Sequence, residues 1–204
     1  IFVGVGGFEA TEKMKENILD VLESGRLSYG HYLSKFEQQF AELHQCSYGI
    51  TSNSGTSSLQ VALQTLKILH NWQDGDEVIV PATTFVATVN IILHNRMTPV
   101  FVDVEADYYG INTDLIEEKI SSKTRCIIPV HLFGMPSNMT RIMEISKKFQ
   151  LKVIEDSAEC MFASFNNQMV GSFGDISCFS TYVAHILTTG VGGISLTSNS
   201  DYAI

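Results

Sequence analysis

Short apolar segments rich in β-branched residues alternate with helical segments along this chain of 204 residues. The strand-like runs cover residues 77–81, 98–104, 125–131, 151–157, 175–180 and 193–197. They are apolar on both faces, which is typical of buried parallel strands. The pattern predicts an α/β fold, a three-layer α/β/α sandwich whose mostly parallel sheet is covered by helices on both faces.

Three segments between these strands have helical features. The first places apolar side chains on one face, namely Leu59, Ala62, Leu63, Leu66 and Leu69. Residues 113–120 begin at a Thr or Asp cap, and residues 138–149 begin at Asn138 and end with two lysines. In such folds ligands bind at the carboxyl ends of the strands, so we expect the site there.

The two ends of the sequence suggest part of a longer protein. The chain begins at Ile1, and residues 198–204 resemble the first turn of a helix. We therefore expect residues 1–204 to form one large domain, the N-terminal part of a chain whose smaller C-terminal domain is absent.

Charge and composition argue against several classes of protein. The net charge is −9 without any basic run, which argues against binding to nucleic acids or anionic membranes. The longest apolar region, residues 77–95, is interrupted by Pro81 and Asn90, so it does not predict a membrane span. The four cysteines are scattered, which indicates buried thiols in a reducing cytoplasm and neither a metal site nor disulfides.

Two glycine-containing segments are candidates for binding phosphate. Ser54, Gly55 and Thr56 begin the first predicted helix, where free N–H groups and the positive helix pole favour an anion. An ordinary helix cap explains the same residues. Residues 4–10 resemble a dinucleotide-binding loop only superficially, because Glu9 replaces the third glycine, and we reject that assignment.

Three further residues are candidates on chemical grounds. Asp156 ends a predicted strand, and a buried carboxylate there needs a positive partner, either a protonated heterocycle or an arginine. Phe85 could stack on a flat ring or belong to the core. His185 lies between a strand and a glycine-rich turn, where a structural and a catalytic role both stay open.

Taken together, the motifs resemble the DegT/DnrJ/EryC1/StrS family of pyridoxal-phosphate sugar aminotransferases, which have the aspartate-aminotransferase fold. The resemblance keeps order and spacing over nearly the whole chain. It lies in residues 24–43, 54–59, 75–88, 99–105, 128–134, 154–159, 171–180 and 188–193.

The resemblance implies a role for each candidate residue. Thr56, the backbone around Gly55 and Ser180 would hold the cofactor phosphate. Phe85 would stack on the pyridine ring, and Asp156 would pair with its protonated nitrogen, which keeps the ring an electron sink. Glu159 stands where the family usually has Gln or His in contact with the phenolic oxygen of the cofactor. A carboxylate there would have to share a proton with that oxygen.

One departure from the family pattern concerns its central lysine. The Schiff-base lysine aligns with His185, while Ser180 keeps its place five residues earlier. Val191 replaces the acid that usually precedes the paired glycines, and no Lys or Arg follows Lys152. An imidazole cannot attach the cofactor covalently, but it can transfer protons near neutral pH.

Histidine at this point resembles the sugar 3-dehydratase branch of the family. That branch implies pyridoxamine phosphate as the working cofactor, a nucleotide-linked 4-keto-6-deoxysugar as substrate, an amino donor such as glutamate, and a homodimer. Two other interpretations stay open. One is a sugar aminotransferase in which His185 is tolerated, is misaligned with the lysine or is an introduced change, and the other is a catalytically silent relative that acts as a scaffold or dimer partner.

Overall fold

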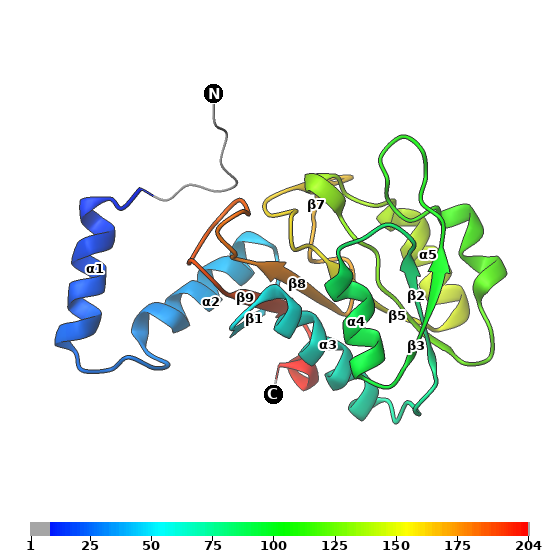
Figure 1. Cartoon of the computed structure of the whole chain (residues 1–204), viewed down its shortest axis with the longest axis horizontal. Coiled ribbons are helices and arrows are strands. Elements are labelled where there is room, and N and C mark those ends of the chain that lie inside the picture. The colour runs from blue at the N-terminus through cyan, green and yellow to red at the C-terminus, as the bar shows by residue number, and fades with distance from the viewer. Residues whose placement is uncertain (1–8, 204) are drawn as a thin grey trace.

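The computed structural model describes residues 9–203, and most of the rejected loop at residues 4–10 lies outside this range. The main sheet has seven strands in the order β1-β9-β8-β5-β4-β2-β3 (Figure 1). The strands are β1 (Tyr48–Ser52), β2 (Glu77–Pro81), β3 (Thr98–Val102), β4 (Thr124–Ile127), β5 (Lys152–Asp156), β8 (Ile176–Ser180) and β9 (Gly193–Thr197). A short hairpin consists of β6 (Ser164–Phe165) and β7 (Gln168–Met169). The helices are α1 (Glu12–Glu23), α2 (His31–Leu43), α3 (Gly55–Leu69), α4 (Val86–His94) and α5 (Met139–Phe149).

Five neighbouring strands form a parallel block, and the expected mostly parallel α/β sandwich is confirmed. β3, β2, β4, β5 and β8 pair in parallel, whereas β9 is antiparallel to both β8 and β1. The prediction of a parallel strand at residues 193–197 is therefore wrong. A parallel neighbour needs a long crossover, usually a helix, but β8 and β9 are joined by a loop that turns the chain back.

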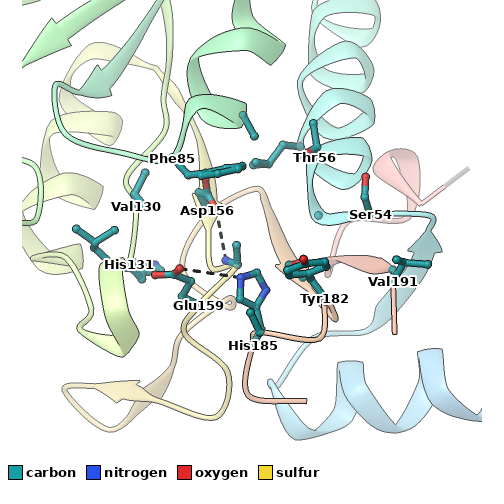
Figure 2. Close-up of a pocket in the computed structure, with 18 of the residues that line it drawn as sticks. Ser54, Thr56, Phe85, Val130, His131, Asp156, Glu159, Tyr182, His185 and Val191 are labelled. Atoms are coloured by element: carbon teal, nitrogen blue, oxygen red, sulfur yellow. Dashed lines mark hydrogen bonds and ion pairs between the residues drawn. The ribbon is translucent and has the colours of Figure 1, made fainter. Parts of the chain in front are cut away.

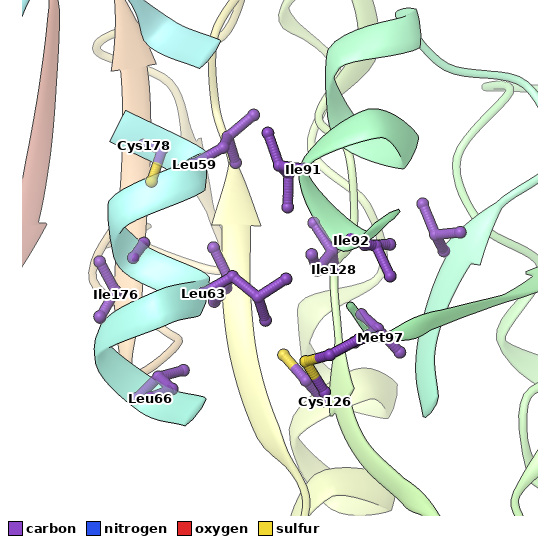
Figure 3. Packing of buried hydrophobic residues seen from close by; sticks show 14 residues of the cluster. Leu59, Leu63, Leu66, Ile91, Ile92, Met97, Cys126, Ile128, Ile176 and Cys178 are labelled. Atoms are coloured by element: carbon purple, nitrogen blue, oxygen red, sulfur yellow. The ribbon is translucent and has the colours of Figure 1, made fainter. Parts of the chain in front are cut away.

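Alternating side chains of the strands supply cores on the two faces of the sheet. Val78 and Val80 of β2 pack with α3 and α4 on one face, whereas Ile79 packs with α5 on the other. Figure 3 shows the first of these cores, where Leu59, Leu63 and Leu66 of α3 approach residues of β4 and β8. The same alternation sends the adjacent residues Glu155 and Asp156 to opposite faces.

The predicted helix at residues 113–120 is wrong in type. This segment forms two 3₁₀ turns, Thr113–Leu115 and Glu117–Lys119, joined at Ile116. The side chain of Ile116 is fully buried in the core that also contains α5. A segment of this length gains little from helix cooperativity, so packing of this one side chain decides its conformation. The predicted turn at the end of the chain is likewise a 3₁₀ turn, Ser200–Tyr202.

Sequence reasoning did not predict α1, α2 or β1. The edge strand β1 is flanked by α2, and a third cluster of buried side chains contains residues of α2, β8 and β9. In Figure 1, α1 stands apart from the sheet, and none of its residues is buried. Within residues 9–203, no helix is both long and apolar enough to cross a lipid bilayer.

Candidate active site

A cavity of about 400 Å³ opens at the carboxyl ends of the parallel strands (Figure 2). Residues from the start of α3, the loop before α4, the end of β5 and the loop after β8 line it. All seven residues predicted from the sequence lie in this lining: Gly55, Thr56, Phe85, Asp156, Glu159, Ser180 and His185. The structure therefore brings the predicted set together in one place.

The amino end of α3 forms one wall of the cavity. The Ser54 hydroxyl caps the helix by accepting a hydrogen bond of 3.1 Å from the Ser57 amide. Within the described part of the chain, the amides of Gly55 and Thr56 have no acceptor. A Cβ atom at Gly55 would lie 2.7 Å from Cβ of Ser180, so only glycine lets α3 approach β8 this closely. Free amides at a helix start next to the hydroxyls of Thr56 and Ser180 suit a phosphate.

Asp156 is a buried carboxylate at the end of β5 and on the floor of the cavity. Its Oδ2 accepts a hydrogen bond of 2.7 Å from the Thr88 hydroxyl, and its Oδ1 accepts one of 3.3 Å from the Ala158 amide. Burial raises the pKa of Asp156, although the bonds from Thr88 and Ala158 and the nearby His131 oppose this. No lysine or arginine of the described residues pairs with it, so a cation from a ligand would complete the site.

Phe85 lies at the mouth of the cavity, immediately before α4. Its side chain remains 72% exposed, so it is not a core residue. Figure 2 shows its ring beside Asp156, in a position where a flat ligand could lie between the aromatic face and the cavity floor. An exposed aromatic ring over a buried carboxylate suits a planar heterocycle with a protonated nitrogen.

His185 and Glu159 face each other on the same side of the cavity (Figure 2). Nε2 of His185 lies 4.0 Å from Oε1 of Glu159. Nδ1 of His185 is buried and has no hydrogen-bond partner among residues 9–203. The other oxygen of Glu159 accepts a hydrogen bond of 3.2 Å from the Phe133 amide. Nε2 of His185 is thus the nitrogen that faces a carboxylate of the cavity lining, and Nδ1 is held by no group of the described chain.

Threonine hydrogen bonds close the loop that carries His185. The hydroxyls of Thr181 and Thr189 are 2.7 Å apart, and the Thr189 amide donates to the Thr181 carbonyl at 3.0 Å. The Thr189 hydroxyl also donates to the carbonyl of Val191. Val191 itself is largely exposed at the cavity rim, where the family pattern has an acid. The loop is therefore closed at its base and presents His185 between its two ends.

Three residues of the site escaped sequence reasoning. His131 and Tyr182 line the cavity, and Thr88 binds Asp156 from below. His131 lies in the segment 128–134, which carries the family resemblance, so the sequence could have predicted that it lies at the site. Its Nδ1 accepts from the Ser137 amide at 3.0 Å, which leaves the proton on Nε2 for Glu155 at 3.1 Å.

Comparison with known proteins decides the family. The model of the DegT/DnrJ/EryC1/StrS aminotransferase family matches residues 9–203. This chain belongs to that family. Its aspartate-aminotransferase-like fold and the resemblance of its motifs are thereby confirmed.

The names of individual relatives refer to different reactions. A GDP-perosamine synthase from Escherichia coli O157:H7 is 42% identical over 93% of this chain and 51% of the relative. The structure of an aminotransferase from Psychrobacter cryohalolentis has a TM-score of 0.90 at 35% identity and covers 96% of this chain and 49% of its own. The E. coli GDP-4-keto-6-deoxy-D-mannose-3-dehydratase, solved with hydrated PLP, has a TM-score of 0.92 at 27% identity, covering 98% and 52%. The chain spans about half the length of the relatives it matches.

The residues of the cavity fit the cofactor that the dehydratase structure contains. The start of α3 with Ser180 offers a phosphate site, Phe85 offers a face for a ring, and Asp156 lacks a cation. These groups match the phosphate, the ring and the protonated nitrogen of that cofactor. Among residues 9–203, no lysine lines the cavity.

Proposed function

We propose that this chain forms the cofactor-binding large domain of a pyridoxamine-phosphate-dependent 3-dehydratase. The substrate would be a nucleotide-linked 4-keto-6-deoxysugar, and an amino donor such as glutamate would restore the amine form of the cofactor. The observation that supports the proposal is His185 in the cavity, where the family resemblance predicts the lysine, with no lysine in the lining that residues 9–203 supply.

The polar groups of the cavity assign the binding roles. Thr56, Ser180 and the free amides at the start of α3 would hold the phosphate. Phe85 would cover the ring, and Asp156 would face its protonated nitrogen. When bound, the amine form supplies the amino group that condenses with the ketone, an electron sink, and the two electrons that replace the 3-hydroxyl with hydrogen.

His185 is the only residue that we assign to proton transfer. Its imidazole lines the cavity, where it can accept a proton and return it to the departing 3-hydroxyl. Glu159 lies opposite Nε2 and would stabilise the charged imidazolium after the first transfer.

A specific observation also favours an aminotransferase. The identity of 42% to a GDP-perosamine synthase exceeds the 27% to the solved 3-dehydratase. In that case His185 would replace the lysine without creating the dehydration chemistry. The two reactions differ in their products, because dehydration leaves a ketosugar with one oxygen fewer and transamination leaves an aminosugar.

Mass analysis of the products separates these possibilities. The protein is incubated with pyridoxamine phosphate and a panel of 4-keto-6-deoxy nucleotide sugars, beside His185→Asn as a matched control. A deoxygenated product that the control does not form supports dehydration. An aminosugar supports the aminotransferase, and cofactor binding without either product supports a catalytically silent protein.

We also propose that the working species is a homodimer. Large apolar side chains around the cavity mouth are exposed, among them Phe85, Phe133, Tyr182, Ile186 and Val191. The part of the chain that the structure describes places no lysine or arginine in the cavity lining, so the diphosphate of a nucleotide sugar needs cations from outside it. A second subunit would supply both cover and charge. Sedimentation as a fully active monomer would contradict this part of the proposal.

A further inference from the structure

A chain of two hydroxyl groups supports the carboxylate of Asp156 from beneath the cavity. Thr88, in the first turn of α4, is completely buried and donates to Oδ2 of Asp156 at 2.7 Å. The hydroxyl of Thr84 lies 2.9 Å from that of Thr88. Thr88 is not among the residues that line the cavity, so it acts on a ligand only through Asp156.

The direction of these hydrogen bonds follows from counting protons. An ionised carboxylate only accepts, so Thr88 must donate its single hydroxyl proton to Asp156. Thr88 can then only accept from Thr84. Donation from Thr84 to Thr88 and from Thr88 to Asp156 therefore favours the ionised carboxylate.

The remaining acceptor capacity of Asp156 is what a ligand can use. Thr88 occupies Oδ2 from one side and the Ala158 amide occupies one position on Oδ1. A carboxylate has about four acceptor positions, and Asp156 lines the cavity, so a donor there can use a position that the protein leaves open. The first turn of α4 adds the positive end of a helix dipole, which also favours the anion.

We propose that Thr88 is a positioning residue that fixes the Asp156 carboxylate as an ionised acceptor toward the cavity. This inference rests on the proposed role of Asp156 as the partner of a protonated ring nitrogen. The threonine does not touch the ligand. It decides how strongly Asp156 binds one.

The first test uses the protein without cofactor. Aspartate labelled with ¹³C reports the titration of Asp156, whose signal is assigned by its loss in Asp156→Asn. Thr88→Val keeps the shape of the side chain and removes the hydroxyl, so it should raise the pKa of Asp156 further, because burial then acts with less opposition. Thr88→Ser should restore the original titration.

The variants leave the other titratable groups near Asp156 unchanged. These groups are His131, Glu159, Cys178 and His185.

The second test measures the affinity for pyridoxal phosphate at neutral pH. Thr88→Val should weaken binding about tenfold, and Thr88→Ser should bind like the unmutated protein. Thr84→Val should also weaken binding, but by a smaller factor. If Thr88→Val does not fold, Thr84→Val replaces it as the test. Thr83→Val removes an exposed neighbouring hydroxyl and should change nothing.

The outcomes separate this inference from the proposed function. An unchanged titration of Asp156 in Thr88→Val, or in Thr84→Val if the first variant does not fold, would overturn the role of Thr88 even where the cofactor binds. If the unmutated protein does not bind the cofactor, the proposed function fails, while the titration still decides whether Thr88 controls Asp156.

Discussion

Glu155 and Asp156 are neighbours on β5, both are buried, and they differ in how their charge is neutralised. Glu155 accepts hydrogen bonds from the amides of Gly171, Phe173 and Gly174, at 2.8 to 2.9 Å, and from Nε2 of His131. Asp156 has one hydroxyl and one weak amide donor and faces the cavity. A buried carboxylate with a complete set of donors stabilises the fold, whereas one with an incomplete set indicates a missing ligand.

The surroundings of Glu155 show why its side of the sheet is structural. The loop of residues 171–174 wraps around the carboxylate and presents three amides to it. Gly171 has φ +98°, and a Cβ atom there would lie 2.6 Å from Cζ of Phe179. Glycine is therefore required for the loop to pack this closely. On the side of Asp156, nothing from the described chain closes over the carboxylate in this way.

The largest effect is expected from removing the charge of Glu155. Glu155→Gln places an amide N–H₂ among donors, so we expect the free energy of unfolding to fall by about 3 kcal/mol. Urea denaturation of the unloaded protein measures this. The exposed Glu144→Gln, which loses only a surface ion pair with Arg141, should stay within about 0.5 kcal/mol. Equal stability of both variants would show that the donors around Glu155 contribute nothing to the fold.

Asp156→Asn should weaken cofactor binding strongly and change the stability of the fold little. We expect affinity for pyridoxal phosphate to fall about a hundredfold, because a neutral amide cannot pair with a protonated ring nitrogen. The free energy of unfolding should change by less than about 1 kcal/mol, since the amide oxygen still accepts from Thr88. Cofactor titration and urea denaturation on the same sample compare the two quantities. Undiminished affinity would remove Asp156 from the site.

A smaller loss of stability is expected at acidic pH, from a buried histidine near Glu155. His44 is buried against Phe40 and Phe179, and its Nδ1 binds the carbonyl of Val170, next to Gly171, at 2.7 Å. Burial lowers the pKa of His44, although the Val170 carbonyl and Glu155 oppose this. Because the unfolded chain then binds a proton more readily than the folded one, stability should fall as pH drops below about 6.5.

His44→Phe keeps an aromatic ring in this cluster and should abolish that part of the acid dependence. Urea denaturation between neutral pH and mildly acidic pH measures it, with the exposed His31→Gln as the control. If the acid dependence survives in His44→Phe, another group is responsible.

The sequence predicted much of the site because its residues follow strands. Asp156 ends β5, Ser180 ends β8 and Gly55 begins α3, so a parallel sheet alone brings them to one edge. The contrast between Glu155 and Asp156 could not be predicted, since it depends on a loop whose path no periodicity describes. The contact between Thr88 and Asp156 joins residues far apart in the chain and emerges only from the packing of α4 on β5.

We expect His185 to occupy the lysine position of the family and the cofactor to be bound without a covalent bond. The most direct test is borohydride reduction of the protein with pyridoxal phosphate, followed by mass mapping, for the unmutated protein and for His185→Lys. We expect the unmutated protein to bind the cofactor without any modified lysine, and the variant to be modified at position 185. Modification of another lysine in the unmutated protein, or a variant that binds the cofactor and stays unmodified at position 185, would contradict the claim.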